Sequence, residues 1–410
     1  MESSTGFNIL ADPQELAAFQ QKLLQKAREP SSLPQSLIKV LNLIKDPKAS
    51  VHDLSEIITR DPSLTIKILK VSNSARYGTR CQVSTIPQAV MILGMKAVGA
   101  LALSTGIYDL TRQWEISIDR NRFWRHSLQV AIASRLIAEQ TGHADPDEVF
   151  VSGLVHDIGV LFMESACPDE FRSIWNQIES KDRLPETELI NYKALHADVG
   201  GSTLRNWNFP SDIAMSVSEH HNVDICNDMD PATQHVRIVA LANLVSPYPT
   251  ARSQQALPDD SANRQALRAG LHIQPVALRQ IVKMLLAQIL LEAEFLEIDL
   301  GSYDEYLQDA NEIIYRQYTG ALKSLKKRKD RKLKGIKPSE LNSILKKAET
   351  ELEQQYNVVC DLLATDWLIQ EKAILSRQNE NLPNSTPAAH IICNQYIAME
   401  NVLRDCGLKV

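Results

Sequence analysis

Five histidines in the middle of the chain lie in settings that suit metal chemistry. They are His126, His156 followed directly by Asp157, His196, and the adjacent pair His220 and His221. Histidine and carboxylate side chains are ligands that divalent transition metals favour. The intervals between these residues are too long for a local ligand motif, and a single histidine on an apolar helix is usually a satisfied core residue. Spacing alone therefore leaves a metal site and a set of buried core histidines both open.

The local context of His156 favours the metal site. His156 and Asp157 stand side by side within the apolar stretch Leu154–Val160, which we interpret as a helix. Burying an imidazole and a carboxylate together costs free energy unless each has a partner. A metal ion is an efficient partner for both groups. The context of His156 and Asp157 therefore favours a metal site over a set of satisfied core histidines.

The elements that would position these residues are helices. Ser50 and Asp53 form a capping box, and Asp61 followed by Pro62 is a second helix start. A third helix opens at Ser84-Thr-Ile-Pro87 and runs to Gly94. Alternating β-branched runs bounded by Asn-Gly or Asp-Gly are nearly absent. The sequence therefore predicts an all-α fold.

The chain divides into three expected parts. Residues 1–30 form a polar amphipathic helix, and residues 31–300 are a densely patterned domain with a surface loop at 247–263. Residues 301–410 form a helical C-terminal extension. We expect the extension to pack on the body through Leu341, Ile344, Leu345 and Leu352.

The overall charge argues against a general polyanion-binding protein. The net charge is −6 at pH 7 and the sequence pI is about 6.0. A local basic block spans residues 323–337 and could attract nucleic acid or anionic lipid. No aromatic residue interleaves with its charges to stack on bases. We therefore interpret the block as a solvated helix or hinge, and expect it to stay exposed.

Cytoplasm is the expected location. No run of eighteen apolar residues is present, and Met1–Ala11 does not have the pattern of a signal peptide. The 6 cysteines lie far apart without a Cys-x-x-Cys pair, which argues against a zinc ribbon or a thioredoxin-like motif.

Motifs in the first hundred residues, together with the histidine order, resemble a known family. The upstream motifs are Leu33-Pro34, Asp61-Pro-Ser-Leu64, Lys70-Val-Ser-Asn-Ser-Ala-Arg-Tyr-Gly78 and Ile86-Pro-Gln-Ala-Val-Met-Ile-Leu-Gly94. They resemble the HDOD family. The histidine order resembles the helical core of the HD phosphohydrolase superfamily, especially its HD-GYP branch. This resemblance covers roughly residues 30–300, and it implies a compact domain of many short helices with a role in bacterial signalling.

The resemblance also implies a set of metal ligands. In active relatives, two metal ions bridged by an aspartate activate a water for attack on phosphorus. The positions that match the ligands are His126, His156, Asp157, His196, His220 and His221, with Asn243 in place of the final aspartate. Asparagine keeps a carbonyl oxygen but lacks the charge that helps to hold a divalent ion. Fe, Mn, Zn and Mg are the candidate metals.

Catalytic accessories of the active relatives are missing. Val160 replaces a lysine that would meet phosphate, and Arg122 stands where some relatives have a glutamate ligand. An arginine there would repel a further metal ion. The chain continues from His221 as Asn222-Val-Asp-Ile225, without a Gly-Tyr-Pro motif. The ligand set is therefore mostly present, while the groups that serve catalysis are not.

Three functions follow as hypotheses. The leading one is a non-catalytic HDOD signal-transduction regulator that acts through a protein partner, with the histidine pocket structural, metal-loaded or ligand-sensing. The second is a metal-dependent phosphohydrolase acting on a nucleotide or cyclic dinucleotide. The third, a nucleic-acid-binding regulator, would use the basic block at 323–337. Arg122, Val160 and Asn243 argue against catalysis.

Overall fold

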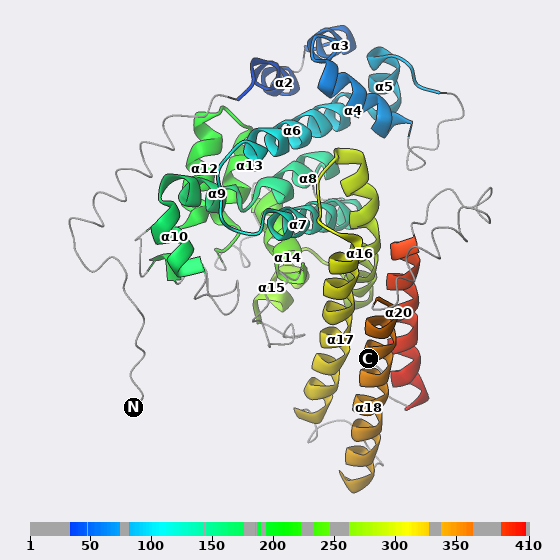
Figure 1. The fold of residues 1–410 in the computed structure, drawn as a ribbon. Helices are drawn as coiled ribbons and strands as arrows, with labels where there is room; N and C mark the ends of the chain where they lie inside the picture. The colour runs from blue at the N-terminus through cyan, green and yellow to red at the C-terminus, as the bar shows by residue number, and fades with distance from the viewer. Residues whose placement is uncertain are drawn as a thin grey trace.

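The computed structural model describes most of the chain between residues 33 and 406. The described residues are 33–46, 48–73, 82–142, 144–175, 185, 187–189, 194–222, 233–246, 262–327, 338–363 and 387–406. All regular elements among them are helices, so the predicted all-α class is confirmed (Figure 1). The expected helix at 1–30 lies outside the described residues, as do most of the loop at 247–263 and the side chains of the block at 323–337.

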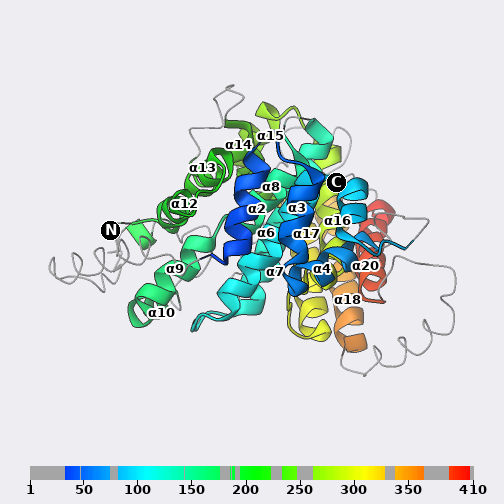
Figure 2. The ribbon, with the colours of Figure 1, turned by 90° about the horizontal axis from the view of Figure 1, so that it is seen from above.

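Five N-terminal helices form a layer at one end of the molecule. They are α2 (Gln35–Lys45), α3 (Val51–Thr59), α4 (Pro62–Ser72), α5 (Ile86–Leu93) and α6 (Met95–Arg112). The predicted starts are confirmed: Ser50 and Asp53 make a reciprocal capping box, and Asp61 caps α4 with Pro62 in its first turn. Gly94, at φ 90°, allows the sharp turn from α5 into α6. In Figure 2 this layer lies over α7 and α8.

The middle of the chain packs around one central helix, α7 (Arg120–Thr141). The helices that follow it are α8 (Pro146–Val155), α9 (Ile158–Ala166), α10 (Pro168–Trp175), α12 (His196–Asn206), α13 (Ser211–Glu219), α14 (Gln234–Val245) and α15 (Ala262–Gly270). Of these, α8 and α14 pack directly on α7, while α9, α10, α12, α13 and α15 pack mainly on one another or on α8 and α14. Helix α7 is buried on almost every side because α8, α14 and α16 (Pro275–Leu296) all pack on it. A helix in that position can present side chains to the interior in several directions.

The C-terminal helices run side by side away from the N-terminal layer (Figure 1). Helices α17 (Tyr303–Lys327), α18 (Pro338–Leu363) and α20 (Pro387–Asp405) pack on one another, and α20 also packs on α16. Leu345 and Leu352 of α18 are buried, but against other helices of the extension and not, as the sequence analysis expected, against residues 31–300. Ile344 is half-buried, and the side chain of Leu341 lies outside the described residues. The main contacts of α18 are with α17 and α20.

Charged and amide side chains fix how these helices dock. The guanidinium of Arg125 on α7, with 3% of its side chain exposed, pairs with the Asp309 carboxylate of α17 at 2.7 Å. Farther along, the Asn311 side chain donates to the Tyr356 carbonyl oxygen and accepts from the amide of Gln395. Buried polar groups need geometrically matched partners. These contacts therefore favour one register for α17, α18 and α20.

One stretch of the described residues is long and apolar enough to cross a membrane. It joins α8 and α9 as Pro146–Ala166, with mean hydropathy 1.4, and 89% of it is buried inside the fold. Helices α5 and α6 pass the same test as a pair, but they are bent by 113°. Burial of this extent is typical of core helices. Such helices are as long and apolar as membrane-spanning ones because they are surrounded by other apolar side chains.

Candidate metal centre

Five helices, α7, α8, α9, α12 and α13, bring six of the predicted ligands together. His126 projects from α7, His196 opens α12, and His220 and His221 follow the last residue of α13. The interpretation of residues 154–160 as one helix is wrong. Asp157, at φ −101° and ψ 10°, lies in a turn between α8 and α9. This break separates the pair His156 and Asp157 from both helices.

The Asp157 carboxylate lies at the centre of the cluster and has two distinct sides. Its Oδ2 atom is 3.2 Å from Nε2 of His156 and 3.8 Å from Nε2 of His126. Its Oδ1 atom is 3.2 Å from Nε2 of His196 and 3.4 Å from Nε2 of His220. One carboxylate thus meets two imidazoles on each side. Figure 1 shows the helices that converge here, α7, α8, α9, α12 and α13.

Three of the imidazoles are fixed in orientation through their other nitrogen. Nδ1 of His156 lies 2.8 Å from the Gly153 carbonyl oxygen, and Nδ1 of His220 lies 2.8 Å from the Val217 carbonyl oxygen. Nδ1 of His196 lies 2.7 Å from the Glu188 carboxylate. An acceptor at Nδ1 places a ring hydrogen there and turns Nε2 toward Asp157. This is the arrangement found in metal-binding histidines.

Close contact between α9 and α12 is what allows His196 to reach Asp157. A Cβ atom on Gly159 would lie 1.9 Å from the His196 carbonyl oxygen and 2.8 Å from the Gly200 backbone nitrogen. Any side chain there would push the two helices apart. The two glycines of the sequence motifs therefore have a packing role next to the cluster.

The protonation states of two histidines differ strongly. Burial lowers the pKa of His220 to about 4, so this imidazole is neutral at pH 7. Burial also lowers the pKa of His196, but the carboxylates of Glu188 and Asp157 outweigh it and raise the pKa to about 9. Without a metal, His196 therefore carries a second proton, which a metal ion would have to displace.

Glu188 is a site residue that the sequence analysis missed. It is fully buried, and its Oε2 atom accepts from both the backbone nitrogen and Nδ1 of His196, at 2.9 Å and 2.7 Å. A carboxylate behind a ligating imidazole orients the ring and makes it a stronger ligand. Glu188 lies eight residues before His196 in the sequence. That spacing belongs to no local motif, so the sequence alone did not indicate its role.

Asn243, Val160 and Arg122 are the other positions that the sequence analysis singled out. Asn243 lies near the end of α14 and is half-buried, and its side chain makes no hydrogen bond to another described residue. Val160 is fully buried in α9 and adds no polar group. The Arg122 guanidinium pairs with Asp119 at 3.4 Å. The cluster that the structure brings together is therefore His126, His156, Asp157, His196, His220 and His221.

These six side chains fit divalent metal ions in two overlapping groups. Donor atoms of Asp157, His196, His220 and His221 all lie within 4.8 Å of one another, and so do those of His126, His156 and Asp157. Imidazole nitrogens with a shared carboxylate suit Zn²⁺, Fe²⁺ or Mn²⁺. The first group offers four ligands and the second only three. We call them the four-ligand group and the three-ligand group.

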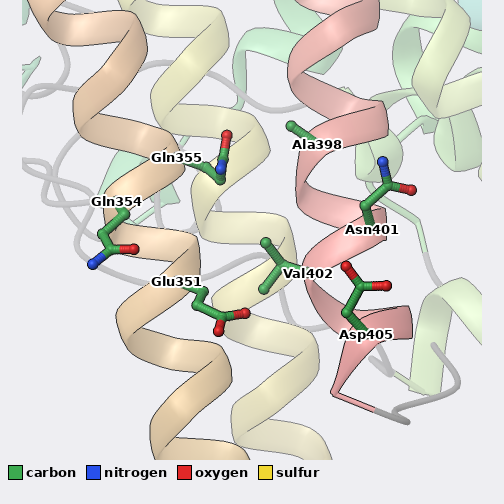
Figure 3. Close-up of a pocket in the computed structure, with 7 residues that line it drawn as sticks. All are labelled: Glu351, Gln354, Gln355, Ala398, Asn401, Val402 and Asp405. Carbon is green, nitrogen blue, oxygen red and sulfur yellow. The ribbon is translucent and has the colours of Figure 1, made fainter.

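The C-terminal helices carry a groove of their own. It lies between α18 and α20, measures about 420 Å³, and is lined by Glu351, Gln354, Gln355, Ala398, Asn401, Val402 and Asp405 (Figure 3). Its lining is mostly carboxylate and amide. It lies far along the chain from the histidine cluster and contributes no ligand to either metal group.

Comparison with known proteins identifies the domain. Residues 31–223 match the family model described as "HDOD domain". An uncharacterized protein of Treponema pallidum (strain Nichols) is 25% identical over 194 residues, 47% of this chain and 37% of that protein. The uncharacterized protein YuxH of Bacillus subtilis (strain 168) is 25% identical over 154 residues, 38% of this chain and 36% of that protein. The chain thus spans little more than a third of the length of these relatives.

Solved structures show the same fold. An HDOD domain protein of unknown function from Geobacter sulfurreducens has a TM-score of 0.55 at 22% identity, covering 70% of this chain and 99% of that one. A proposed phosphohydrolase from Shewanella amazonensis SB2B has a TM-score of 0.53 at 22% identity, covering 68% and 98%. A protein of proposed signal-transduction function from Marinobacter aquaeolei VT8 has a TM-score of 0.55 at 18% identity, covering 71% and 68%.

The unequal ligand groups predict one tightly held metal ion per chain. After loading with Zn²⁺ and dialysis, metal analysis should give about one ion, because structural zinc takes four protein ligands. His220→Ala should abolish this binding, whereas His126→Ala should retain it. His235→Ala, a histidine outside the cluster, is the control. Two retained ions, or equal losses in the His126 and His220 variants, would contradict the assignment.

Glu188→Gln should weaken metal binding without changing the fold. Glutamine can still accept from Nδ1 of His196 but carries no charge, and such changes typically cost about 10–100-fold in metal affinity. The measurement is competition with a chromophoric chelator, alongside circular dichroism. Glu139→Gln, an exposed carboxylate on α7, should bind as the unaltered chain does. Equal affinity in the Glu188 variant would show that the buried carboxylate does not support the cluster.

Proposed function

Residues 31–223 are an HDOD domain, and from this premise we propose that the chain is a non-catalytic regulator of signal transduction. In this proposal it is cytoplasmic, holds one divalent metal ion in the histidine cluster and acts on a protein partner. The metal would stabilise the junction of α9, α12 and α13 by neutralising the buried carboxylate and by tying these three helices together.

Enclosure of the cluster is the observation that carries the non-catalytic assignment. His126, His156, Asp157, His196 and His220 are each at most 4% exposed, and only His221 is half-buried. Attack on a phosphoester requires the phosphorus atom to approach both a nucleophile and the groups that stabilise developing charge. Enclosure of this extent among the described residues supports a regulator rather than a hydrolase.

Missing charges support the same assignment. The position after Gly159 holds buried Val160, which cannot neutralise a phosphate. Asn243 supplies no anionic ligand, so the three-ligand group lacks the charge that would hold a second ion. Two-metal hydrolysis needs both ions, because one positions the nucleophile while the other stabilises the leaving oxygen.

A metal-dependent phosphohydrolase acting on a nucleotide or cyclic dinucleotide is the second candidate. One observation favours it: Oδ1 and Oδ2 of Asp157 face different histidine groups, as a carboxylate that bridges two ions would. Bound metals in such a site lower the pKa of a coordinated water and polarise the phosphoryl oxygen.

Hydrolysis assays distinguish the two candidates. We expect no turnover of cyclic dinucleotides or simple phosphodiesters with Mn²⁺, Fe²⁺ or Mg²⁺ added. Loss of one anionic ligand and of the phosphate-facing cation each removes several kcal/mol of transition-state stabilisation. Product formation is followed by chromatography. Turnover by the unaltered chain that disappears in the Asp157→Ala variant would contradict the non-catalytic proposal and support the phosphohydrolase.

The protein partner is proposed to bind the C-terminal extension. Val358 on α18 and Ile397 on α20 are 51% and 55% exposed. Each lies one helical turn along the chain from a residue that lines the groove in Figure 3, Gln354 for Val358 and Asn401 for Ile397. Exposed apolar side chains next to a polar groove are common in surfaces that bind proteins. Nucleic acid is not favoured as a partner, given the net charge of −6.

Capture experiments with the full chain test this surface. Proteins retained by the unaltered chain from lysate should be lost with Val358→Ser combined with Ile397→Ser, because the apolar anchors contribute most of the binding energy. Ile66→Ser, which removes a 64% exposed isoleucine from α4, is the matched control and should retain them. If the two variants behave alike, the partner binds elsewhere.

A further inference from the structure

The groove between α18 and α20 carries its carboxylates at one end. Glu351 and Asp405 lie at that end, while Gln355 lies at the other (Figure 3). The Cys406 thiol donates to the Glu351 carboxylate at 3.8 Å. The Gln395 amide donates to the Gln355 carbonyl oxygen at 3.1 Å, so the two helices run antiparallel. The acidic end of the groove is therefore the end nearer the start of α18.

The lining of the groove suits long basic side chains. Val402, which is 7% exposed, and half-buried Ala398 contribute apolar carbon atoms. Gln354, Gln355 and Asn401 contribute amide groups. Lysine and arginine lay their methylene stems along apolar surface and direct their charged heads to carboxylate and carbonyl oxygens. A segment rich in these residues therefore matches both kinds of atom in the groove.

Cations of the extension balance its acids only in part. The Lys347 ammonium pairs with Glu351 at 3.6 Å, and the Arg404 guanidinium donates to the side chain of Asn401. Over their full lengths, α18 and α20 together contain seven Asp and Glu residues against three Lys and Arg residues. With histidine neutral, the two helices thus carry a net charge of −4, and a basic segment is the complementary occupant.

The most basic segment of the sequence joins α17 to α18. This basic block, residues 323–337, contains nine Lys and Arg residues and one acid, Asp330, which gives a net charge of +8. Leu325, Leu333 and Ile336 add apolar side chains to it. The chain therefore contains both members of a complementary pair, an acidic groove and a basic segment.

Chain length favours the groove of another copy over the groove of the same copy. The groove extends along α18 from Glu351 to Gln355, about 20–26 Å from Pro338 along the helix axis. Only ten residues join Lys327 to Pro338, so the middle of that segment reaches at most about 20 Å from either anchor. Occupying its own groove would require both arms to be fully extended, at a cost in conformational entropy. A second copy removes this limit.

From these observations we propose that the chain self-associates, with the basic block of one copy bound in the groove of a second copy. A two-fold arrangement allows each copy to supply its block and to offer its groove, so that the assembly closes at two copies. The inference goes beyond the proposed function, in which a different protein binds through Val358 and Ile397.

Sedimentation velocity of the full chain measures this association. We expect a dimer at low ionic strength and a monomer in about 0.5 M salt, where charges are screened within a few ångströms. Glu351→Lys combined with Asp405→Lys, the groove variant, should stay monomeric at low ionic strength, because a basic groove repels the basic block. Glu139→Lys combined with Asp169→Lys, at two exposed acids outside the extension, is the matched control and should dimerise as the unaltered chain does.

A charge-swap mixture makes the test specific to this pair of surfaces. The block variant combines Arg328→Glu, Lys329→Glu, Arg331→Glu, Lys332→Glu and Lys334→Glu. Alone it should be monomeric, because its block and its groove are both acidic. Mixed with the groove variant it should form a heterodimer, since each block then faces a groove of opposite charge. A variant that had merely failed to fold would not regain association in the mixture.

An unaltered chain that stays monomeric at low ionic strength would overturn the proposal. So would equal association of the groove variant and the unaltered chain, or a charge-swap mixture that remains monomeric. Proteins that a monomeric unaltered chain retains from lysate, and that the groove variant loses, would assign the groove to a different protein and not to a second copy.

Discussion

A single buried carboxylate determines much of the middle of this structure. Asp157 is 1% exposed and lies within 4 Å of imidazole nitrogens from α7, α12 and the ends of α8 and α13. An isolated carboxylate in that position would be costly, so its neighbours must either share protons with it or share a metal ion. The surrounding helices bring four imidazoles close enough to Asp157 for either arrangement.

The packing around Asp157 has two consequences for function. Gly159 allows α9 to touch α12, and acceptors behind His156, His196 and His220 direct their Nε2 atoms inward. Helix α7 links the cluster to the extension, because His126 points to Asp157 while the adjacent Arg125 pairs with Asp309 of α17. A movement of His126 would therefore act next to Arg125, whose ion pair with Asp309 joins α7 to α17.

The helices could be predicted from local signals in the sequence. Contacts between segments that are distant in the sequence could not be predicted in this way. Ser50 with Asp53, and Asp61 with Pro62, specify helix starts by bonds within one turn, so the sequence was sufficient. The histidine set could be predicted only through the family motifs, because its members are up to 95 positions apart. The turn at Asp157 was missed since the flanking residues are apolar throughout. Glu188 was missed because its role depends on a fold that no local pattern encodes.

The central claim is that the Oδ1 side of Asp157 holds a metal ion together with His196, His220 and His221. Anomalous diffraction from crystals of the full chain loaded with Zn²⁺, measured on both sides of the zinc absorption edge, tests it most directly. The account predicts one strong peak about 2.0–2.2 Å from a carboxylate oxygen and from imidazole nitrogens of that group. An empty four-ligand group beside a zinc peak elsewhere in the chain would contradict it.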